Sequence, residues 1–129
     1  ATVNTAALVA RLQRLMADDV GPFRTGAGLA RALTGIAALA EELGPTPPGM
    51  PGQAHDLARL DWFDLRQMLL VARAVVLAAL ARHENRGAHQ REDYPGMLPE
   101  WELNQVLSYR EGKLALKPMR PAPLAKAAQ

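Results

Sequence analysis

One segment, from Asp56 to about His83, limits the fold more than any other part of the chain. Apolar side chains recur in it every three or four residues, the period of an α-helix, and they fall on more than one face. They are Leu60, Phe63, Leu65, Met68, Leu69, Ala72, Val75, Val76, Ala79 and Leu80. Such a helix belongs at the centre of a bundle, and its surplus apolar surface favours a partner or a neighbouring domain.

The same segment is too short and too charged for a membrane helix. Its longest apolar run, from Met68 to Ala81, falls below the roughly 18–20 residues of a membrane span and contains Arg73. We therefore expect no direct membrane span. The Arg73 stem is expected to lie on apolar surface with its head in water, and the alternative is a buried pair with a carboxylate.

Two more helices precede this segment. Residues Thr5 to about Val20 carry leucines at helical spacing, with Asn4 or Thr5 as the candidate N-cap, and Gly21-Pro22 ends that helix. Thr25 is the candidate N-cap of a second helix that runs to about Leu43. A dinucleotide-binding loop at its start is disfavoured, because the third glycine of that motif is missing and no strand precedes it.

The C-terminal part predicts a β-hairpin. Residues Leu103 to Tyr109 and Lys113 to Lys117 suit two short strands, and Gly112 suits the turn between them. Residues 44–55 hold four prolines and three glycines and are typical of a linker, and residues 119–129 are typical of a tail. The predicted fold is mainly α, a three-helix bundle with a short C-terminal β-hairpin and a Pro-rich linker and tail, in a single helical domain of residues 1–129.

The composition excludes several classes of protein. The chain has no cysteine, which rules out disulfides and cysteine-held iron–sulfur clusters within it and fits a reducing compartment. The formal net charge is only +2, and basic and acidic residues are interleaved, so we expect no nucleic-acid partner. Because the chain starts at Ala1 rather than Met, a processing site or cut is expected there.

Directly after the apolar helix, residues 84–95 concentrate three acidic side chains, two arginines and a histidine. A network of ion pairs that fixes the helix end, with Gly87 at the C′ position, is the favoured interpretation. A metal site on His83, Glu84, His89 and Asp93 is disfavoured by its spacing. Acid–base catalysis by His89 is chemically reasonable, but no nucleophile or cofactor motif accompanies it. We predict no catalytic, cofactor-binding or metal-binding residue in the chain.

The same run, Glu84-Asn85-Arg86-Gly87-Ala88-His89-Gln90-Arg91-Glu92-Asp93-Tyr94-Pro95, resembles the Glu-Ser-Arg-Gly-Ala-His-x-Arg-x-Asp-x-Pro signature of the succinate dehydrogenase/fumarate reductase flavoprotein family, in its C-terminal helical domain. L-aspartate oxidase shares much of this signature. Further matches occur in the same order: Leu12-Gln13 with Met16, Arg24-Thr25-Gly26 with Leu29, Leu65-Arg66 through Ala81-Arg82, and Trp101. Two departures are Asn85 in place of serine, and Gly96 to Pro99 in place of acidic residues.

The resemblance implies a non-catalytic C-terminal domain of a flavin-dependent oxidoreductase that interconverts succinate and fumarate. No cofactor is expected in this fragment, whereas the parent protein would bind FAD. The implied partners are the FAD and capping domains of the parent chain and an iron–sulfur subunit. The structural or interface candidates are Glu84, Asn85, Arg86, Gly87, His89, Arg91 and Asp93. They are expected to hold the helix end in register and to touch the flavin domain.

Two alternatives stay open. The first alternative is that the chain is the C-terminal domain of an L-aspartate oxidase. The second is that it is a stand-alone helical protein-interaction module. The implied location is cytoplasmic, with membrane association through partner subunits.

Overall fold

The first two helices begin at predicted caps. In the computed structural model, which describes residues 3–125, α1 spans Thr5–Asp19 and α2 spans Gly26–Leu43. The Asn4 side chain accepts a hydrogen bond from the Ala7 amide at 3.1 Å, and the Thr25 hydroxyl accepts one from the Gly28 amide at 3.0 Å. Each cap satisfies an amide that the first turn of a helix leaves without a backbone partner.

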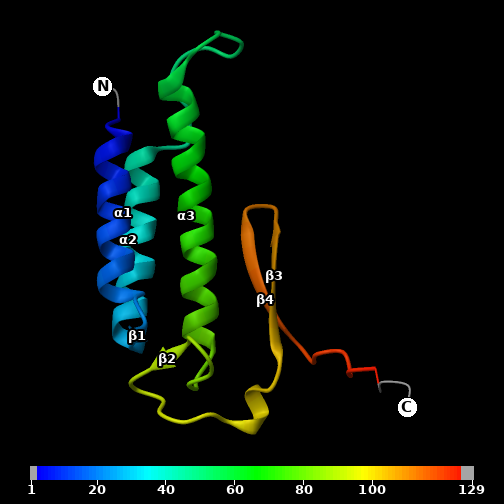
Figure 1. Ribbon diagram of the computed structural model, residues 1–129. Helices are drawn as coiled ribbons and strands as arrows, with labels where there is room; N and C mark the ends of the chain where they lie inside the picture. Colours follow the sequence, from blue (N-terminus) through cyan, green and yellow to red (C-terminus); the bar gives the residue numbers. More distant parts are fainter. Residues whose placement is uncertain (1–2, 126–129) are drawn as a thin grey trace.

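The third helix, α3, spans Leu57–Ala81 and is the longest element (Figure 1). Asp56 caps its start by accepting a hydrogen bond from the Arg59 amide at 3.1 Å. The predicted end near His83 to Gly87 is wrong, because the backbone is already extended at Arg82. Gly87 does have a positive φ of 58°, but it sits in the tight turn between Arg86 and His89 and not at the helix end.

The three helices stand side by side and share one apolar core (Figure 1). The core side chains come from all three helices, and the largest apolar ones that are fully buried are Leu29, Leu39, Leu65 and Val76. The helices α1 and α2 approach closely at Gly35, where an added Cβ would lie 2.1 Å from Leu15 Cδ1. The mainly α, three-helix prediction is confirmed.

A small parallel pairing at the base of the bundle was not predicted. Strand β1, Phe23–Arg24, lies between α1 and α2, and it pairs with β2, Gln90–Arg91. The pairing continues through the Glu92 amide, which donates to the Arg24 carbonyl at 2.8 Å. The expectation that no strand precedes the second helix is therefore wrong, and residues 23–26 bind the polar stretch that follows α3.

The predicted hairpin is confirmed, with the first strand shifted by one residue and the second strand two residues longer than predicted. After the short 3₁₀ helix η1, Pro99–Trp101, β3 spans Asn104–Arg110 and pairs antiparallel with β4, Lys113–Met119. The turn residues Glu111 and Gly112 have φ of 51° and 76°, the two left-handed conformations of a tight hairpin. The hairpin lies beside α3, on the side away from α1 (Figure 1). Residues 126–129 of the predicted tail lie outside the described residues.

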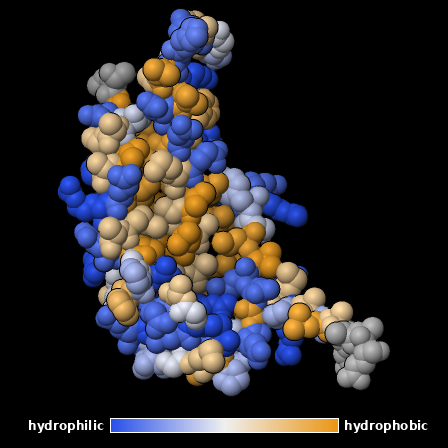
Figure 2. All heavy atoms as spheres, viewed as in Figure 1, coloured by the Kyte–Doolittle hydropathy of each residue, from blue (hydrophilic) through white to orange (hydrophobic). Residues whose placement is uncertain are grey.

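Helix α3 keeps an apolar strip that the other described elements leave partly exposed. Leu57, Leu60, Met68, Val71 and Val75 are between 37% and 70% exposed. In Figure 2 apolar residues run down the middle of one face of the molecule, and hydrophilic residues gather at its base. No helix within residues 3–125 combines the length and hydropathy that crossing a bilayer requires.

Candidate functional site

The polar stretch after α3 is built around the buried carboxylate of Glu84. Because the backbone is extended beyond Ala81, side chains two residues apart point to the same side. The Glu84 carboxylate therefore receives the Arg82 guanidinium at 2.7 Å and the Arg86 guanidinium at 2.8 Å. The Leu98 amide donates a third contact at 3.0 Å. Glu84 is fully buried, so these three donors replace its lost water.

The charge state of Glu84 follows from these contacts. Burial by itself would raise the pKa of the carboxyl, since it disfavours the charged form. The hydrogen bonds from Arg86, from the Leu98 amide and from Arg82 outweigh that effect and lower the pKa to about 2. Glu84 is therefore ionised at neutral pH, and the site is a charged triad in the interior.

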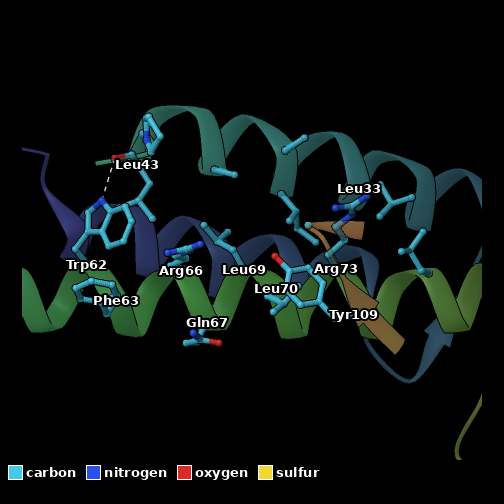
Figure 3. Close-up of a pocket in the computed structure, with 17 residues that line it drawn as sticks. Leu33, Leu43, Trp62, Phe63, Arg66, Gln67, Leu69, Leu70, Arg73 and Tyr109 are labelled. Carbon is cyan, nitrogen blue, oxygen red and sulfur yellow. Dashed lines mark hydrogen bonds between the residues drawn. The ribbon is translucent and has the colours of Figure 1, made fainter. Parts of the chain in front are cut away.

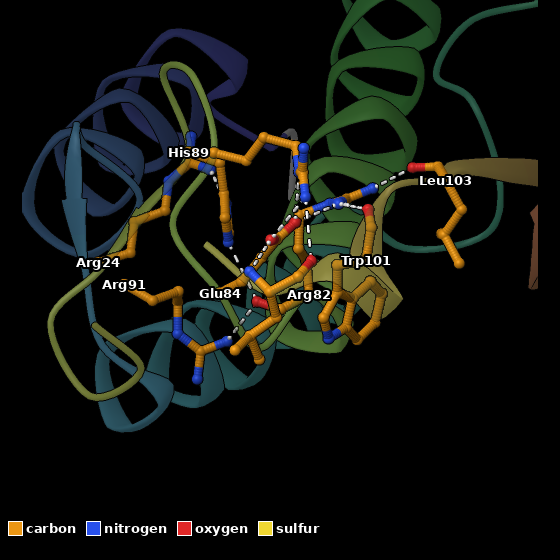
Figure 4. A network of polar contacts seen from close by, with 9 residues as sticks. Arg24, Arg82, Glu84, His89, Arg91, Trp101 and Leu103 are labelled. Carbon is orange, nitrogen blue, oxygen red and sulfur yellow. Dashed lines mark hydrogen bonds and ion pairs between the residues drawn. The ribbon is translucent and has the colours of Figure 1, made fainter. Parts of the chain in front are cut away.

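Arg82 extends the triad to the chain before the hairpin. Its guanidinium donates to the Trp101 carbonyl at 2.9 Å and to the Leu103 carbonyl at 2.8 Å, and it lies over the Trp101 ring (Figure 4). Arg86 similarly donates to the Leu98 carbonyl at 3.0 Å. The two arginines thus attach the segment that leads to β3 to the end of α3.

Arg91 closes the C-terminus of α3. Its side chain is only 2% exposed. One guanidinium nitrogen donates to the carbonyls of Ala79 and Leu80 at 3.0 and 3.1 Å, which the helix itself leaves without partners. The positive charge also suits the negative end of the helix dipole.

Asp93 joins this arginine to the start of α2. Both of its carboxylate oxygens accept from Arg91 at 2.9 Å, and one also accepts from the Gly26 amide at 2.9 Å. Arg91 holds the pKa of Asp93 well below its usual range, despite the opposing effect of burial. Since Gly26 is the first residue of α2, one carboxylate links the beginning of α2 to the end of α3.

His89 is held as a neutral imidazole. Its Nε2 lies 3.1 Å from the Arg82 carbonyl, which can only accept, so Nε2 carries the proton. Its Nδ1 then accepts from the Arg24 guanidinium at 3.2 Å. Burial lowers the pKa of His89, and the nearby charges of Arg24, Arg82 and Arg91 lower it further, although the carbonyl contact opposes them.

The structure brings the seven candidate residues into one cluster. Asn85 accepts a hydrogen bond from the Arg91 amide through its side chain, and Gly87 forms the turn that returns the chain to His89. Sequence reasoning did not assign Arg24 to the cluster. The match of Arg24-Thr25-Gly26 to the family was a signal that could have pointed to Arg24. The sequence alone, however, did not indicate what this motif contacts.

The cluster borders an open apolar cavity of about 510 Å³. We name this cavity the valine groove, and its lining includes Arg24, Val71, Val75, Arg82, His89 and Leu107. The two valines belong to the exposed strip of α3, and Leu107 comes from the hairpin. The polar cluster therefore forms one end of a groove whose other lining residues are apolar except for Gln105.

Among the described residues, the acidic candidate metal ligands and the amides at the start of α2 already have other partners. Within residues 3–125 no three histidine or acidic side chains come together as a ligand set, and Glu84 and Asp93 are both taken by arginines. At the start of α2 the Gly26 amide is bound by Asp93 and the Gly28 amide by Thr25. A phosphate at this helix start would have to displace both partners.

Arg73 is exposed at the surface of α3. Its side chain borders a second apolar cavity and takes part in none of the ion pairs of the described residues. This agrees with the expected arrangement, an arginine whose stem lies on apolar surface.

Comparison with known proteins gives a consistent family. Residues 9–124 match the family described as "Fumarate reductase flavoprotein C-term". The chain is 33% identical, over 83% of its length and 19% of the relative, to one subunit of the fumarate reductase (CoM/CoB) of Methanothermobacter marburgensis. It is 38% identical, over 74% of its length and 16% of the relative, to the L-aspartate oxidase of Mycobacterium leprae.

A solved structure agrees with these relatives. Mycobacterium smegmatis Sdh1 in complex with UQ1 superimposes with a TM-score of 0.81 at 32% identity, over 95% of this chain and 21% of that chain. The chain thus spans about a fifth of the length of the relatives that it matches. The match covers the signature and all three helices, and the chain therefore belongs to the C-terminal domain family of the succinate dehydrogenase and fumarate reductase flavoproteins.

Proposed function

We propose that this chain is a non-catalytic docking domain that packs against the FAD-binding domain of a longer oxidoreductase through the valine groove. The observation that carries the proposal is the exposure of apolar side chains beside a rigid polar cluster. Val71 is 61% exposed and Val75 is 40% exposed, and both line the groove that Arg24 and His89 close. An apolar surface of this kind is typical of a contact with another domain.

The chemistry of the cluster favours a scaffold over a catalyst. Among the described residues, no buried side-chain nitrogen or oxygen lacks a hydrogen-bond partner. Both nitrogens of His89 are engaged, and the acidic side chains of the cluster bind arginines. In this proposal Glu84, Asn85, Arg86, Gly87, His89, Arg91 and Asp93 hold the end of α3, β2 and the start of α2 in register. The groove wall that they support is then the contact surface.

The parent activity that we propose is FAD-dependent oxidation or reduction of a dicarboxylate. The relatives support both a succinate/fumarate reaction and an L-aspartate oxidase reaction, since proteins of both names match this chain. In the first case an iron–sulfur subunit would be a further partner, and membrane attachment would come from other subunits. In the second case the same domain would serve a different dicarboxylate.

The association can be tested directly. The flavin-binding part of the parent reading frame is purified apart from this chain, and their affinity is measured by calorimetry. The double variant Val71→Lys/Val75→Lys should bind at least about tenfold more weakly, because two charges would have to be buried. Ala38→Lys, at an exposed position of α2, is the matched control and should bind as well as the unchanged chain. Equal binding by both variants would contradict the docking face.

The activity is tested on the reassembled protein. Bleaching of the flavin by succinate supports the succinate/fumarate reaction, and bleaching by L-aspartate supports the oxidase. A reading frame that contains no Gly-x-Gly-x-x-Gly motif upstream would favour the stand-alone interaction module instead. Binding of FAD by this chain alone would overturn both proposals.

A further inference from the structure

A second, larger groove lies on a different side of α3, between α2 and α3 (Figure 3). Its volume is about 1090 Å³, and we name it the arginine groove after Arg66 and Arg73, which border it. The tip of the hairpin reaches its edge through Tyr109 and Gly112. None of its lining residues belongs to the polar cluster or to the valine groove.

The floor of the arginine groove is apolar and includes small side chains. Helix α2 contributes Leu33, Ala37 and Ala40, and α3 contributes Leu70 and Leu77. The small alanines leave room for a backbone to approach α2 closely. On the α3 side the lining extends from Trp62 to Leu77, which corresponds to about 22 Å along a helix axis.

Both ends of the groove are marked by aromatic side chains. At one end Trp62 is buried, and its indole N–H donates to the Leu43 carbonyl at 3.3 Å. Toward the other end, Tyr109 is half-exposed beside Arg73 (Figure 3). A groove of this length would hold about four turns of an α-helix. It lies where a fourth helix of a bundle would pack against α2 and α3.

The two arginines give the groove a repeated positive charge. Arg66 and Arg73 are seven residues apart, so they lie on one side of α3, about 10 Å from one another along its axis. Among residues 3–125 neither has a carboxylate within ion-pair distance, whereas Arg11, Arg31, Arg82, Arg86 and Arg91 all do. The Arg66 guanidinium lies over the Trp62 ring, 5.6 Å from its centroid, which keeps it along the groove.

We propose that the arginine groove binds an acidic amphipathic helix of a partner protein. Its apolar face lies on the alanines and leucines of the floor, and two of its carboxylates, seven residues apart, meet Arg66 and Arg73. The spacing of the charges disfavours a simple fatty acid as the occupant, because an acyl chain carries one anion at one end. This inference does not depend on the proposed function, since it concerns a separate face.

Designed peptides test the proposal. The probe is a labelled helical peptide of about 15 residues, with leucine and alanine on one face and two glutamates seven residues apart. Its twin carries lysines in place of the glutamates. Fluorescence anisotropy should show that the glutamate peptide binds the unchanged chain at least about tenfold more tightly than its lysine twin.

Charge reversal provides the sharper measurement. Arg66→Glu/Arg73→Glu should reverse the preference, so that the lysine peptide binds more tightly than the glutamate peptide. Arg14→Glu/Arg120→Glu, a charge reversal at two exposed positions that line neither groove, is the matched control and should leave the preference unchanged. Circular dichroism establishes that each variant retains the helical content of the unchanged chain.

Three results would overturn the proposal. They are equal affinity for the two peptides, no binding of either peptide by the folded chain, and an unchanged preference after charge reversal. Vesicles that contain phosphatidylserine are a parallel probe. Binding of these vesicles by a chain that binds neither peptide, lost on charge reversal, would assign the arginines to a lipid surface.

Discussion

At the scale of single residues, two glutamates of this chain pair with arginines in very different surroundings. Glu84 is fully buried between Arg82 and Arg86, whereas Glu42 meets Arg11 with half of each side chain exposed. Glu84→Ala should lower the free energy of unfolding by about 3–5 kcal/mol, because the mostly buried Arg82 and the partly buried Arg86 would both lose their buried partner. Urea unfolding measured by circular dichroism checks this value.

Glu42→Ala is the matched control. Its loss leaves Arg11 in water, so the urea midpoint should change little. Similar losses in the two variants would show that the burial of Glu84 does not determine its contribution. In that case the cluster would not be the element that fixes the end of α3.

His89 makes stability depend on pH. In the unfolded chain its pKa is near the ordinary 6.5, and burial lowers the pKa in the folded chain. Below pH 6.5 the unfolded chain therefore binds a proton that the folded chain does not, and the free energy of unfolding falls as the pH drops. We expect a lower melting temperature at about pH 5 than at about pH 7.

His89→Gln keeps a donor and an acceptor but cannot titrate, so it should reduce this slope. His55→Gln, in the loop before α3, is the control and should retain the slope. An unchanged slope in His89→Gln would contradict the neutral-imidazole assignment.

A second loss of stability is expected at more acid pH. The pKa of Glu84 is about 2 when folded and near 4.5 when unfolded, so its contribution is lost as the pH falls through that window.

At the scale of elements, the contact between α1 and α2 depends on Gly35. A glycine in the middle of a helix ordinarily costs about 1 kcal/mol relative to alanine. Gly35→Ala should nevertheless destabilise the chain, because the added methyl would collide with Leu15 on α1. Combining it with Leu15→Ala should cost less than the sum of the two single changes, since the smaller side chain makes room. Additive losses in thermal melts would contradict this close approach.

The elements also show which parts of the fold the sequence can predict. The helices and the hairpin were predicted because their periodicity and caps, such as Asn4 and Thr25, are local signals. The pairing of β1 with β2 was missed, because strands of two residues carry no periodicity and their partners are 67 residues apart. The end of α3 was predicted too far along the chain. Arg82 and Glu84 are residues that a helix accepts, and no glycine or proline follows Ala81 until Gly87.

The candidate site was predictable in membership but not in geometry. The signature residues from Glu84 to Asp93 could be chosen from their density and the family resemblance. Which carboxylate is buried could not, since that depends on Leu98 and on the chain before β3 folding back over the end of α3. Arg24 could not be placed beside His89 either, because only the tertiary fold joins residues 65 positions apart.

At the scale of the whole molecule, order should decrease from the helical core to the hairpin. The core of α2 and α3 holds fully buried side chains, such as Leu29, Leu65 and Val76. The hairpin has no fully buried residue, and its contacts with α3 rest on side chains such as Leu107 and Tyr109 that are themselves partly exposed. A hairpin with so little cover is marginally stable in water.

Hydrogen exchange measures this gradient. In the isolated chain the amides of β3 and β4 should exchange much faster than those in the middle of α3, because local opening of the hairpin exposes little apolar surface. The turn variant Gly112→Ala, at a φ of 76°, should speed exchange in the hairpin and leave α3 unchanged.

When the flavin-binding part of the parent is added, exchange of the hairpin should slow, because Leu107 lines the valine groove where that part is proposed to dock. Hairpin amides that exchange as slowly as α3 in the isolated chain would show that the hairpin needs no partner.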